Sequence, residues 1–490
     1  MPLTERLRQN LSRPLVAAAR TDDDAPSAHL IGAHGAGMKA LSELLQDRGW
    51  RLTGSDASAS ARVGASFPGL SAETSSSVEN RQILRIHGGH SADHVPASVD
   101  AVIHSPAIGE SNPERENARQ RGIPEVSYVE MIGELIREQT GICVAGTHGK
   151  TTTTALVATI LREAGLDPSA IVGGEVIQYA RSGWSGNGEC FVAEACEYRR
   201  HFLKFRPKIA AILNIEADHF DCFDSHRDVC NAFHEFAGTV SPKGLIVVNS
   251  DNAAAVESIR DCRCRVETIS VLDDADWAVT DIEPAGLQTR FRVAHRGQNF
   301  GTFTIPLPGE HNVENALAAI ALCHAAGVSS DLIREVMPRF RGVRRRFELV
   351  GTVRGATIID DYAHHPTAVK ATLAAARQSF GRRRLVAAFQ PHQVLRTQRL
   401  MNEFATSFRP ADQVYLVPIF AAREESGNNE ATLLELGDRI AQKGVAVEVL
   451  TSLDQLLTTV EDSARPEDVW ITMGAGDINR VAHESVRTLQ

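Results

Sequence analysis

The sequence lacks the features that would place it in a membrane or outside the cell. No apolar run approaches the roughly 18 residues that a spanning helix needs, and the stretch from Met1 to Ser12 carries no apolar signal core. The 8 cysteines include no CxxC pair, and Cys262 and Cys264 are too close together for a usual metal knuckle. We therefore predict a cytoplasmic protein with reduced thiols and no membrane insertion.

An excess of positive charge is also absent. The 51 lysines and arginines are outnumbered by 61 acidic residues, which gives a formal net charge of −10. A nucleic-acid-binding protein needs a basic face, so we expect no nucleic-acid partner. A chain of 490 residues is too long for one core and predicts two to four domains. The sequence leaves open whether the chain is a monomer or a homodimer.

The first structured segment follows a tail or linker, which we place at residues 1–27 and whose purpose the sequence does not reveal. The apolar strand His29–Ile31 leads into Gly32–Gly37, and a helical pattern then ends at Gly49. A second strand ends at Asp56. This order is typical of a dinucleotide-binding fold, although the glycines read G-x-x-G-x-G instead of G-x-G-x-x-G. The turn is either a phosphate-facing loop or simply a tight turn.

The second segment opens with a nucleotide-binding motif. An apolar strand ends in Gly146-Thr147-His148-Gly149-Lys150-Thr151-Thr152, and a helix follows. Glycines let backbone N–H groups surround phosphate oxygens, and the start of the helix adds its positive end. Lys150 can reach the β- and γ-phosphates, and the Thr151 hydroxyl can bind Mg²⁺. This shortened P-loop predicts a site for a nucleoside triphosphate.

Two further strand ends carry candidate metal ligands. Glu194 and His219 follow apolar strands of the same segment, and ligands gather at the carboxyl ends of parallel strands. Together with Thr151 they could complete a metal shell, whereas His219 alone could be an ordinary loop histidine. Asn312 stands near the start of a later helix, where it could cap the helix or recognise a base.

The third segment has polar residues at the ends of four expected strands. These stretches are residues 360–366, 390–397, 421–424 and 474–477. Loops are often polar, but four such ends in one sheet indicate a functional face. The arginine run 339–346 would ordinarily be a solvated surface, yet it lies at a boundary between two cores.

The motifs together resemble the Mur ligases of peptidoglycan synthesis. The resemblance rests on Gly-Thr-His-Gly-Lys-Thr-Thr, Asn-Ile-Glu-Ala-Asp-His, Gly-Glu-His-Asn, Asp-Asp-Tyr-Ala-His-His-Pro and Phe-Gln-Pro-His, and it extends from about His29 to Asp477. It implies an α/β protein of three domains. These are an N-terminal Rossmann-like UDP-binding domain (28–138), a central P-loop ATPase domain with a mostly parallel sheet (139–338) and a C-terminal Rossmann-like domain that receives the amino acid (339–490).

The resemblance also implies a reaction. With ATP and Mg²⁺, L-alanine would be joined to the lactyl carboxylate of UDP-N-acetylmuramate through an acyl phosphate. Alternatives are a murein-recycling ligase that adds a ready-made peptide, and a nucleotide-binding regulator without turnover. A small pocket separates alanine from serine or glycine only modestly, so the preferred amino acid stays open.

Residue roles follow from the same resemblance. The implied catalytic groups are Lys150, Glu194, His219 and His364. The implied metal ligands are Thr151, Glu194 and His219. The implied ATP contacts are Gly146, Thr147, His148, Gly149, Lys150, Thr151, Thr152, His311, Asn312, Arg345, Arg346 and Asp361. The implied substrate contacts are Gly35, Gly37, Asp56, Tyr362, His364 and Arg396.

Three positions depart from the pattern of the family. His34 stands where glycine is more frequent, Cys196 where aspartate is common, and Gln393 where many members carry arginine. The exchange at Gln393 removes one expected cation. We expect these departures to affect substrate contacts and to leave the ATP chemistry intact.

Overall fold

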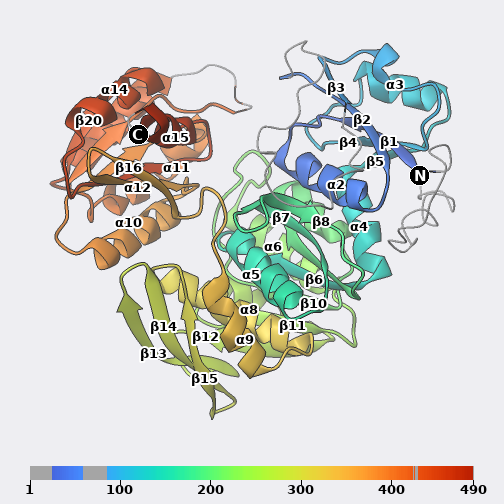
Figure 1. Cartoon of the computed structure of the whole chain (residues 1–490), viewed down its shortest axis with the longest axis horizontal. Coiled ribbons are helices and arrows are strands. Elements are labelled where there is room, and N and C mark those ends of the chain that lie inside the picture. Colours follow the sequence, from blue (N-terminus) through green and yellow to red (C-terminus); the bar gives the residue numbers. More distant parts are fainter. Residues whose placement is uncertain (1–24, 59–84, 423, 425–428, 489–490) are drawn as a thin grey trace.

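The chain is built around three separate β-sheets. The computed structural model describes residues 25–58, 85–422, 424 and 429–488, so residues 1–24 of the expected tail lie outside the described residues. The N-terminal domain and the C-terminal domain lie on either side of the central domain (Figure 1). Each sheet contains parallel strands joined by helices, and the expected α/β class with three domains is confirmed. In the described part of the chain, no helix is both long and apolar enough to span a bilayer.

The N-terminal sheet is wholly parallel, with strand order β3-β2-β1-β4-β5. Its strands are β1 (Ser27–Ile31), β2 (Arg51–Asp56), β3 (Arg85–Gly88), β4 (Ala101–His104) and β5 (Glu125–Ser127). Its helices in the described residues are α2 (Ala36–Asp47), the short η2 (Ala92–His94), α3 (Pro113–Gln120) and α4 (Tyr128–Glu138). This order is that of a Rossmann-like sheet. The strand β1 begins at Ser27, one residue before the expected start of the domain.

The central sheet has ten strands in the order β15-β14-β13-β12-β11-β10-β6-β9-β7-β8. The central strands are β6 (Thr140–Ala145), β7 (Ser169–Val176), β8 (Arg181–Trp184), β9 (Cys190–Ala195), β10 (Ile209–Ile212), β11 (Leu245–Asn249), β12 (Arg265–Ser270), β13 (Trp277–Ala285), β14 (Gln288–His295) and β15 (Gln298–Ile305). Strands β14 and β15, and β8 at the other edge, pair antiparallel, and the pairs between β13 and β7 are parallel.

Two helices of the central domain are buried on nearly all sides. They are α5 (Lys150–Glu163), which leaves the P-loop, and α8 (Glu310–Ala325). The helix α8 is rich in alanine and aliphatic residues, whereas α5 has five threonines beside its aliphatic residues, and the two helices pack against each other over the sheet. The remaining helices are η3 (Tyr198–Lys204), α6 (His226–Ala237), α7 (Ala253–Ser258), α9 (Ser330–Val336) and η4 (Met337–Arg339). The close packing of α5 and α8 fixes the P-loop against a rigid support.

The C-terminal sheet has the order β16-β17-β21-β18-β19-β20, and only β16 pairs antiparallel. Its strands are β16 (Glu348–Val353), β17 (Ala356–Asp361), β18 (Leu385–Phe389), β19 (Gln413–Leu416), β20 (Ala446–Val449) and β21 (Val469–Met473). Its helices are α10 (Pro366–Phe380), α11 (Val394–Arg399), α12 (Met401–Ser407), α13 (Asn429–Ala441), α14 (Leu453–Ser463) and α15 (Asn479–Thr488). The polar stretches at 360–366, 390–397 and 474–477 therefore follow three adjacent parallel strands.

The N-terminal and central domains share one continuous core. The helix α2 packs against β7 and β8, and a Cβ atom added at Gly183 would lie 2.0 Å from the backbone oxygen of Ala40. The Glu43 carboxylate accepts hydrogen bonds from the backbone N–H groups of Ser182 (2.8 Å) and Gly183 (2.9 Å). Because this interface is apolar and hydrogen-bonded, these two domains form a firmer unit than two modules joined by a linker.

A buried carboxylate holds the N-terminal sheet to α3. Glu114 has no exposed surface, and it accepts hydrogen bonds from the Ser55 hydroxyl (2.5 Å) and the Ser91 N–H (3.2 Å). The Nδ1 atom of His94 lies 3.0 Å from the same carboxylate, and the ring of His29 lies 3.7 Å away. Burial opposes ionisation, but the interactions with His29 and Ser55 outweigh it and lower the pKa of Glu114 to about 2.

We predict that Glu114→Gln destabilises the N-terminal sheet. A carboxyl pKa near 2 in the folded protein, below its ordinary value of 4.5, corresponds to roughly 3 kcal/mol of stability. This contribution is present above pH 4.5 and is lost as the pH falls towards about 2. Hydrogen exchange at pH 7 should therefore show faster exchange of β1 and β2 in the variant. Glu116→Gln, an exposed acid on the same helix, is the control, and equal exchange in both variants would contradict the prediction.

Candidate active site

The P-loop connects β6 to α5 through two glycines with left-handed backbone angles. Gly146 has a φ of +147° and Gly149 a φ of +81°, which only glycine adopts easily. A Cβ atom added at Gly149 would lie 2.2 Å from the Oδ1 atom of Asn315 in α8. Asn315 in turn accepts a hydrogen bond from the Thr153 hydroxyl (3.2 Å). The turn therefore depends on the packing of α5 against α8, and Asn315 is a residue that sequence analysis did not identify.

Lys150 begins α5, and its ammonium group is buried. The Nζ atom donates hydrogen bonds to the backbone oxygens of Gly146 and Thr147, and it forms an ion pair of 3.0 Å with Glu197. Burial opposes the charge, but Glu197 outweighs it, so the pKa of Lys150 is raised above its ordinary value. Sequence analysis did not identify Glu197, although it follows Glu194 at the end of the same strand.

Thr151 and Glu194 form a pair of oxygen donors beside the P-loop. The Thr151 hydroxyl donates to Glu194 (2.8 Å), and the same carboxylate accepts a hydrogen bond from the N–H of Gly173 (3.1 Å). Magnesium prefers oxygen ligands, so these two residues fit the predicted metal site. The guanidinium of Arg346 also donates to the Thr151 hydroxyl (3.1 Å), which brings the segment before the C-terminal sheet to the P-loop.

The third expected metal ligand, His219, lies against Glu197. The Nε2 atom of His219 is 3.4 Å from the Glu197 carboxylate, and the backbone of His219 has a φ of +52°. Burial opposes protonation, but the hydrogen bond to Glu197 and the charge of Asp218 raise the pKa of the imidazole. Glu197 therefore joins two sequence-predicted catalytic residues, Lys150 and His219.

The expected nucleotide contacts in α8 lie close to the P-loop. The Asn312 side chain is buried, donates to the backbone oxygen of Pro308 (2.8 Å) and accepts from Asn315 (3.3 Å). Asn312 is therefore not the N-cap of α8, a position that Gly309 occupies. Burial, together with the nearby His148, lowers the pKa of His311 to about 4, so this ring is neutral at pH 7.

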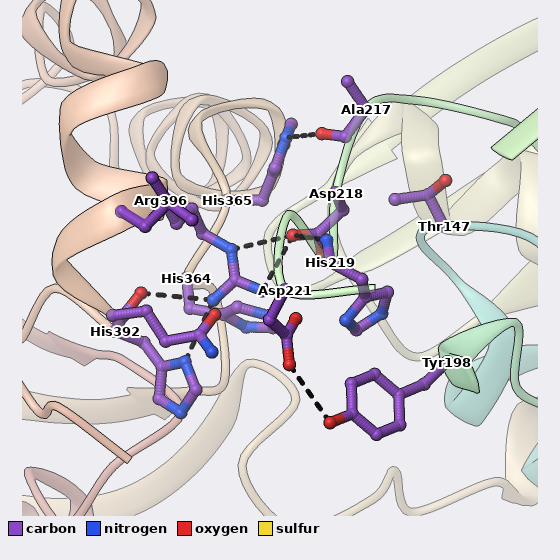
Figure 2. Close-up of polar contacts among 12 residues, drawn as sticks. Thr147, Tyr198, Ala217, Asp218, His219, Asp221, His364, His365, His392 and Arg396 are labelled. Carbon is purple, nitrogen blue, oxygen red and sulfur yellow. Dashed lines mark hydrogen bonds and ion pairs between the residues drawn. The ribbon is translucent and has the colours of Figure 1, made fainter. Parts of the chain in front are cut away.

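The central and C-terminal domains meet through a buried ion pair. Arg396 of α11 donates from its Nε and Nη2 atoms to the Asp218 carboxylate at 2.7 Å, and both side chains are at most 6% exposed. The same guanidinium lies 2.9 Å from the Nδ1 atom of His392 (Figure 2). Arg396 was expected to contact the substrate, and here its guanidinium joins two domains.

Tyr362 and its neighbours form the C-terminal side of the site. Arg345 and Arg346 lie over the Tyr362 ring, with guanidinium carbons 4.9 and 4.8 Å from the ring centre. His364 is positioned by a 2.8 Å contact from its Nδ1 atom to the backbone oxygen of Tyr362. Burial and the charge of Arg396 lower the pKa of His364 well below its usual range, so the ring is neutral.

Asp361 and Arg345 form hydrogen bonds within the C-terminal domain. The Asp361 carboxylate accepts hydrogen bonds from the N–H groups of Phe347 (2.8 Å) and Ala363 (2.7 Å). Arg345 donates to the backbone oxygens of Gly474 (2.6 Å) and Gly476 (3.0 Å). Both residues hold the loops at the strand ends together. Their expected contact with ATP stays a prediction.

The expected sugar-nucleotide contacts occupy the glycine turn after β1. Asp56 accepts a hydrogen bond from the backbone N–H of His34 (2.9 Å), which ties the end of β2 to this turn. Gly35 is the N-cap of α2, and a Cβ atom added at Gly37 would lie 2.9 Å from the Tyr128 ring. The glycine turn is therefore set by packing as well as by backbone geometry.

The three departures have different surroundings. The His34 ring lies 3.2 Å from the Ser58 hydroxyl at the surface. Burial and the nearby Glu197 raise the pKa of Cys196 to about 12, so this thiol is neutral where an aspartate would be charged. Gln393 is the N-cap of α11 with a φ of +68°.

Of the polar stretch at 421–424, Arg423 lies outside the described residues. Glu424 accepts hydrogen bonds from the backbone N–H groups of Val394 and Leu395 at the start of α11.

We predict that breaking the Asp218–Arg396 pair separates the two domains. Asp218→Ala and Arg396→Ala each leave one buried charge without its partner, a change that typically costs about 3–5 kcal/mol. Small-angle X-ray scattering should show a larger radius of gyration for each single variant. The double variant should lose less stability than the sum of the losses in the two single variants, because it leaves no buried charge without a partner.

Asp454→Asn is the control for this experiment, because Asp454 pairs with Arg480 at the exposed surface. A scattering curve of either single variant that matches the wild type would show that the ion pair does not hold the domains together.

Comparison with known proteins places this geometry in a family. Three family profiles match consecutive parts of the chain: "Mur ligase family, catalytic domain" at residues 27–140, "Mur ligase middle domain" at 144–323 and "Mur ligase, glutamate ligase domain" at 345–476. The chain is 38% identical to the UDP-N-acetylmuramate–L-alanine ligase of Salinibacter ruber over 467 residues, which is 94% of each chain. It is 38% identical to the enzyme of the same name from Desulfitobacterium hafniense, covering 94% of this chain and 99% of the relative.

Solved structures agree with these matches. The crystal structure of the UDP-N-acetylmuramate–alanine ligase of Thermotoga maritima superimposes with a TM-score of 0.78 at 25% identity, covering 94% of this chain and 98% of that one. A murein peptide ligase of Psychrobacter arcticus superimposes with a TM-score of 0.68 at 27% identity, covering 95% and 99%. By sequence, by domain order and by fold, this chain belongs to the Mur ligase family of ATP-dependent ligases.

Proposed function

We propose that this protein joins L-alanine to the lactyl carboxylate of UDP-N-acetylmuramate at the expense of ATP, in the synthesis of peptidoglycan precursors. One observation carries the proposal: the P-loop hydroxyl of Thr151 contacts both the Glu194 carboxylate and the Arg346 guanidinium from the C-terminal side. Phosphate-binding groups and groups from the amino-acid-receiving domain thus meet at one point. The substrates, UDP-N-acetylmuramate and L-alanine, are those in the names of relatives that are 35–38% identical to this chain.

In the first step, a carboxylate oxygen of the sugar nucleotide attacks the γ-phosphorus of ATP, and ADP leaves. Two anions must approach each other, so positive charge has to lie beside both. Lys150 and Arg346 supply this charge. Thr151 and Glu194 would hold Mg²⁺, which neutralises phosphate charge when bound. His219 is the third proposed ligand of this metal, and Glu197 holds its ring, with the Nε2 atom 3.4 Å from the carboxylate.

In the second step, the amine of L-alanine attacks the acyl carbon, and phosphate leaves with the former carboxylate oxygen. The amine must lose a proton as the amide bond forms. His364 suits a place beside the amine because its ring is neutral and its Nδ1 atom is engaged with the Tyr362 backbone oxygen. Its Nε2 atom is then the ring nitrogen with a lone pair, and it can accept a hydrogen bond.

The substrates are small and soluble, so we place the enzyme in the cytoplasm, and the net charge of −10 argues against a nucleic-acid partner. ATP, UDP-N-acetylmuramate and L-alanine would bind to the central, N-terminal and C-terminal domains, respectively. Gly35, Gly37 and Asp56 are the proposed contacts of the UDP group. Tyr362 and His364 are the proposed contacts on the side of the acyl acceptor. Arg396 would act indirectly, through its ion pair with Asp218 at the domain interface.

The proposed function is tested by ADP release with ATP, Mg²⁺ and UDP-N-acetylmuramate, adding one amino acid or peptide at a time. We expect stimulation by L-alanine, together with an increase in the mass of the sugar nucleotide that equals alanine minus water. Serine and glycine should stimulate more weakly. Stimulation by a tripeptide alone would make the protein a murein-recycling ligase, and ADP release that ignores every acceptor would exclude a ligase.

Lys150→Ala should lower kcat by at least about 100-fold, because the developing charge on the γ-phosphate loses its cation. Lys208→Ala, which removes a surface lysine of the same domain, is the control and should leave kcat unchanged. Normal turnover of Lys150→Ala would exclude the proposed role.

Glu197→Gln should lower kcat by roughly tenfold, because a charged hydrogen bond to Lys150 is lost. Glu197 also raises the pKa of Lys150, so its loss should move the alkaline limb of the pH profile of kcat to lower pH. A lower kcat with an unshifted alkaline limb would mean that Glu197 acts only through folding.

A further inference from the structure

Three side chains converge at the interface of the central and C-terminal domains, and two of them, Glu216 and His365, have no role in the proposed reaction. We call His148, Glu216 and His365 the His–Glu–His cluster. His148 belongs to the P-loop, Glu216 follows β10, and His365 is the N-cap of α10. One ligand atom from each lies within 4.8 Å of the other two. The cluster therefore brings two imidazoles and one carboxylate together from both sides of a domain boundary.

Two separations within the cluster are close to those between the ligands of a metal ion. The Glu216 Oε2 atom lies 3.4 Å from the Nε2 atom of His148 and 3.5 Å from the Nδ1 atom of His365. Ligand atoms held at about 2.0–2.1 Å from a tetrahedral zinc ion are about 3.3 Å apart. Glu216 thus already lies near the spacing of a zinc ligand relative to both histidines, and all three ligand atoms lie within 4.8 Å of one another.

The hydrogen bonds around the cluster orient its donors. The Nε2 atom of His365 contacts the backbone oxygen of Ala217 at 3.3 Å (Figure 2), so the N–H group is on Nε2 and the lone pair is on Nδ1, the ring nitrogen nearer to Glu216. Burial and the charge of His148 lower the pKa of His365 to about 4, which keeps that lone pair available at pH 7. Among the described residues, the Nδ1 atom accepts one hydrogen bond, from the N–H of Thr367. At 3.4 Å this hydrogen bond is long.

Glu216 is held by a residue of the other domain. The Thr367 hydroxyl donates to its Oε2 atom at 2.7 Å, and the nearby His148 ring outweighs the effect of burial and lowers the pKa of Glu216 to about 2. A carboxylate fixed by a hydroxyl, and an imidazole fixed by a carbonyl, are the supporting contacts usual around metal ligands.

We propose that the His–Glu–His cluster binds a divalent transition-metal ion of the zinc class and that the ion fastens the C-terminal domain to the P-loop. Imidazole with carboxylate is the donor set that suits zinc, whereas the oxygen pair Thr151 and Glu194 suits magnesium. Three protein ligands leave the fourth position to water. The site is thus separate from the proposed magnesium site.

The proposed ion would inhibit turnover. Since its ligands come from two domains, it binds most tightly when the domains are together and opposes their opening. Release of ADP and of the ligated product requires opening, so kcat should fall. Binding of the ion does not depend on the proposed function, whereas this inhibition rests on it.

Zinc affinity of the full chain, measured without substrates by competition with a chromogenic chelator, tests the site. Glu216→Gln and His365→Asn should each weaken binding by at least tenfold. Asparagine is a favourable N-cap residue, so the start of α10 is preserved in the second variant. His234→Ala, which removes a surface histidine paired with Asp261, is the control and should bind like the wild type.

Cobalt(II) gives an independent measurement, because thiolate ligands produce an intense ultraviolet charge-transfer band that histidine and carboxylate do not. We expect a visible spectrum of tetrahedral cobalt without that band, lost in both variants. Equal affinity in the wild type and both variants, or a thiolate band, would overturn the site. Zinc inhibition of ligation should disappear in His365→Asn, and its persistence there would overturn the inhibitory role.

Discussion

A buried lysine ammonium at the start of α5 is the constraint on which the site depends. A charge in this position needs compensation, and Glu197 and two P-loop backbone oxygens supply it. Because Glu197 also contacts His219, the same carboxylate links Lys150 to the loop that follows β10. These contacts hold the P-loop and the loops after β9 and β10 together at the carboxyl ends of the strands, where the nucleotide is expected to bind.

The second constraint is that the groups gathered around the P-loop come from different domains. The C-terminal domain contacts the P-loop through the hydrogen bond from Arg346 to Thr151. It contacts the loop after β10 through the ion pair between Arg396 and Asp218. The N-terminal domain, in contrast, is fixed to the central domain by a shared core. The molecule is therefore a firm two-domain unit with a third domain attached mainly by polar contacts, an arrangement suited to opening and closing around substrates.

Much of this could be predicted from sequence because the P-loop and the strand ends have strong local patterns. Gly-Lys-Thr-Thr after an apolar strand predicted that Lys150 and Thr151 lie in a P-loop, and Glu194, chosen for its place at a strand end, does lie beside Thr151. Glu197, Asn315 and Glu114 were not identified, because their importance comes from contacts between residues far apart in the chain. Arg396 was identified for a substrate contact, but its pairing with Asp218 could be seen only once two domains were placed together.

The central claim is that ATP activates the carboxylate of the sugar nucleotide, so one carboxylate oxygen must leave in the phosphate. Ligation with UDP-N-acetylmuramate labelled with ¹⁸O in the lactyl carboxylate, followed by mass analysis of the released phosphate, tests this most directly. The account predicts one ¹⁸O atom transferred to phosphate for each amide bond formed. Unlabelled phosphate alongside normal amide formation would contradict activation through an acyl phosphate.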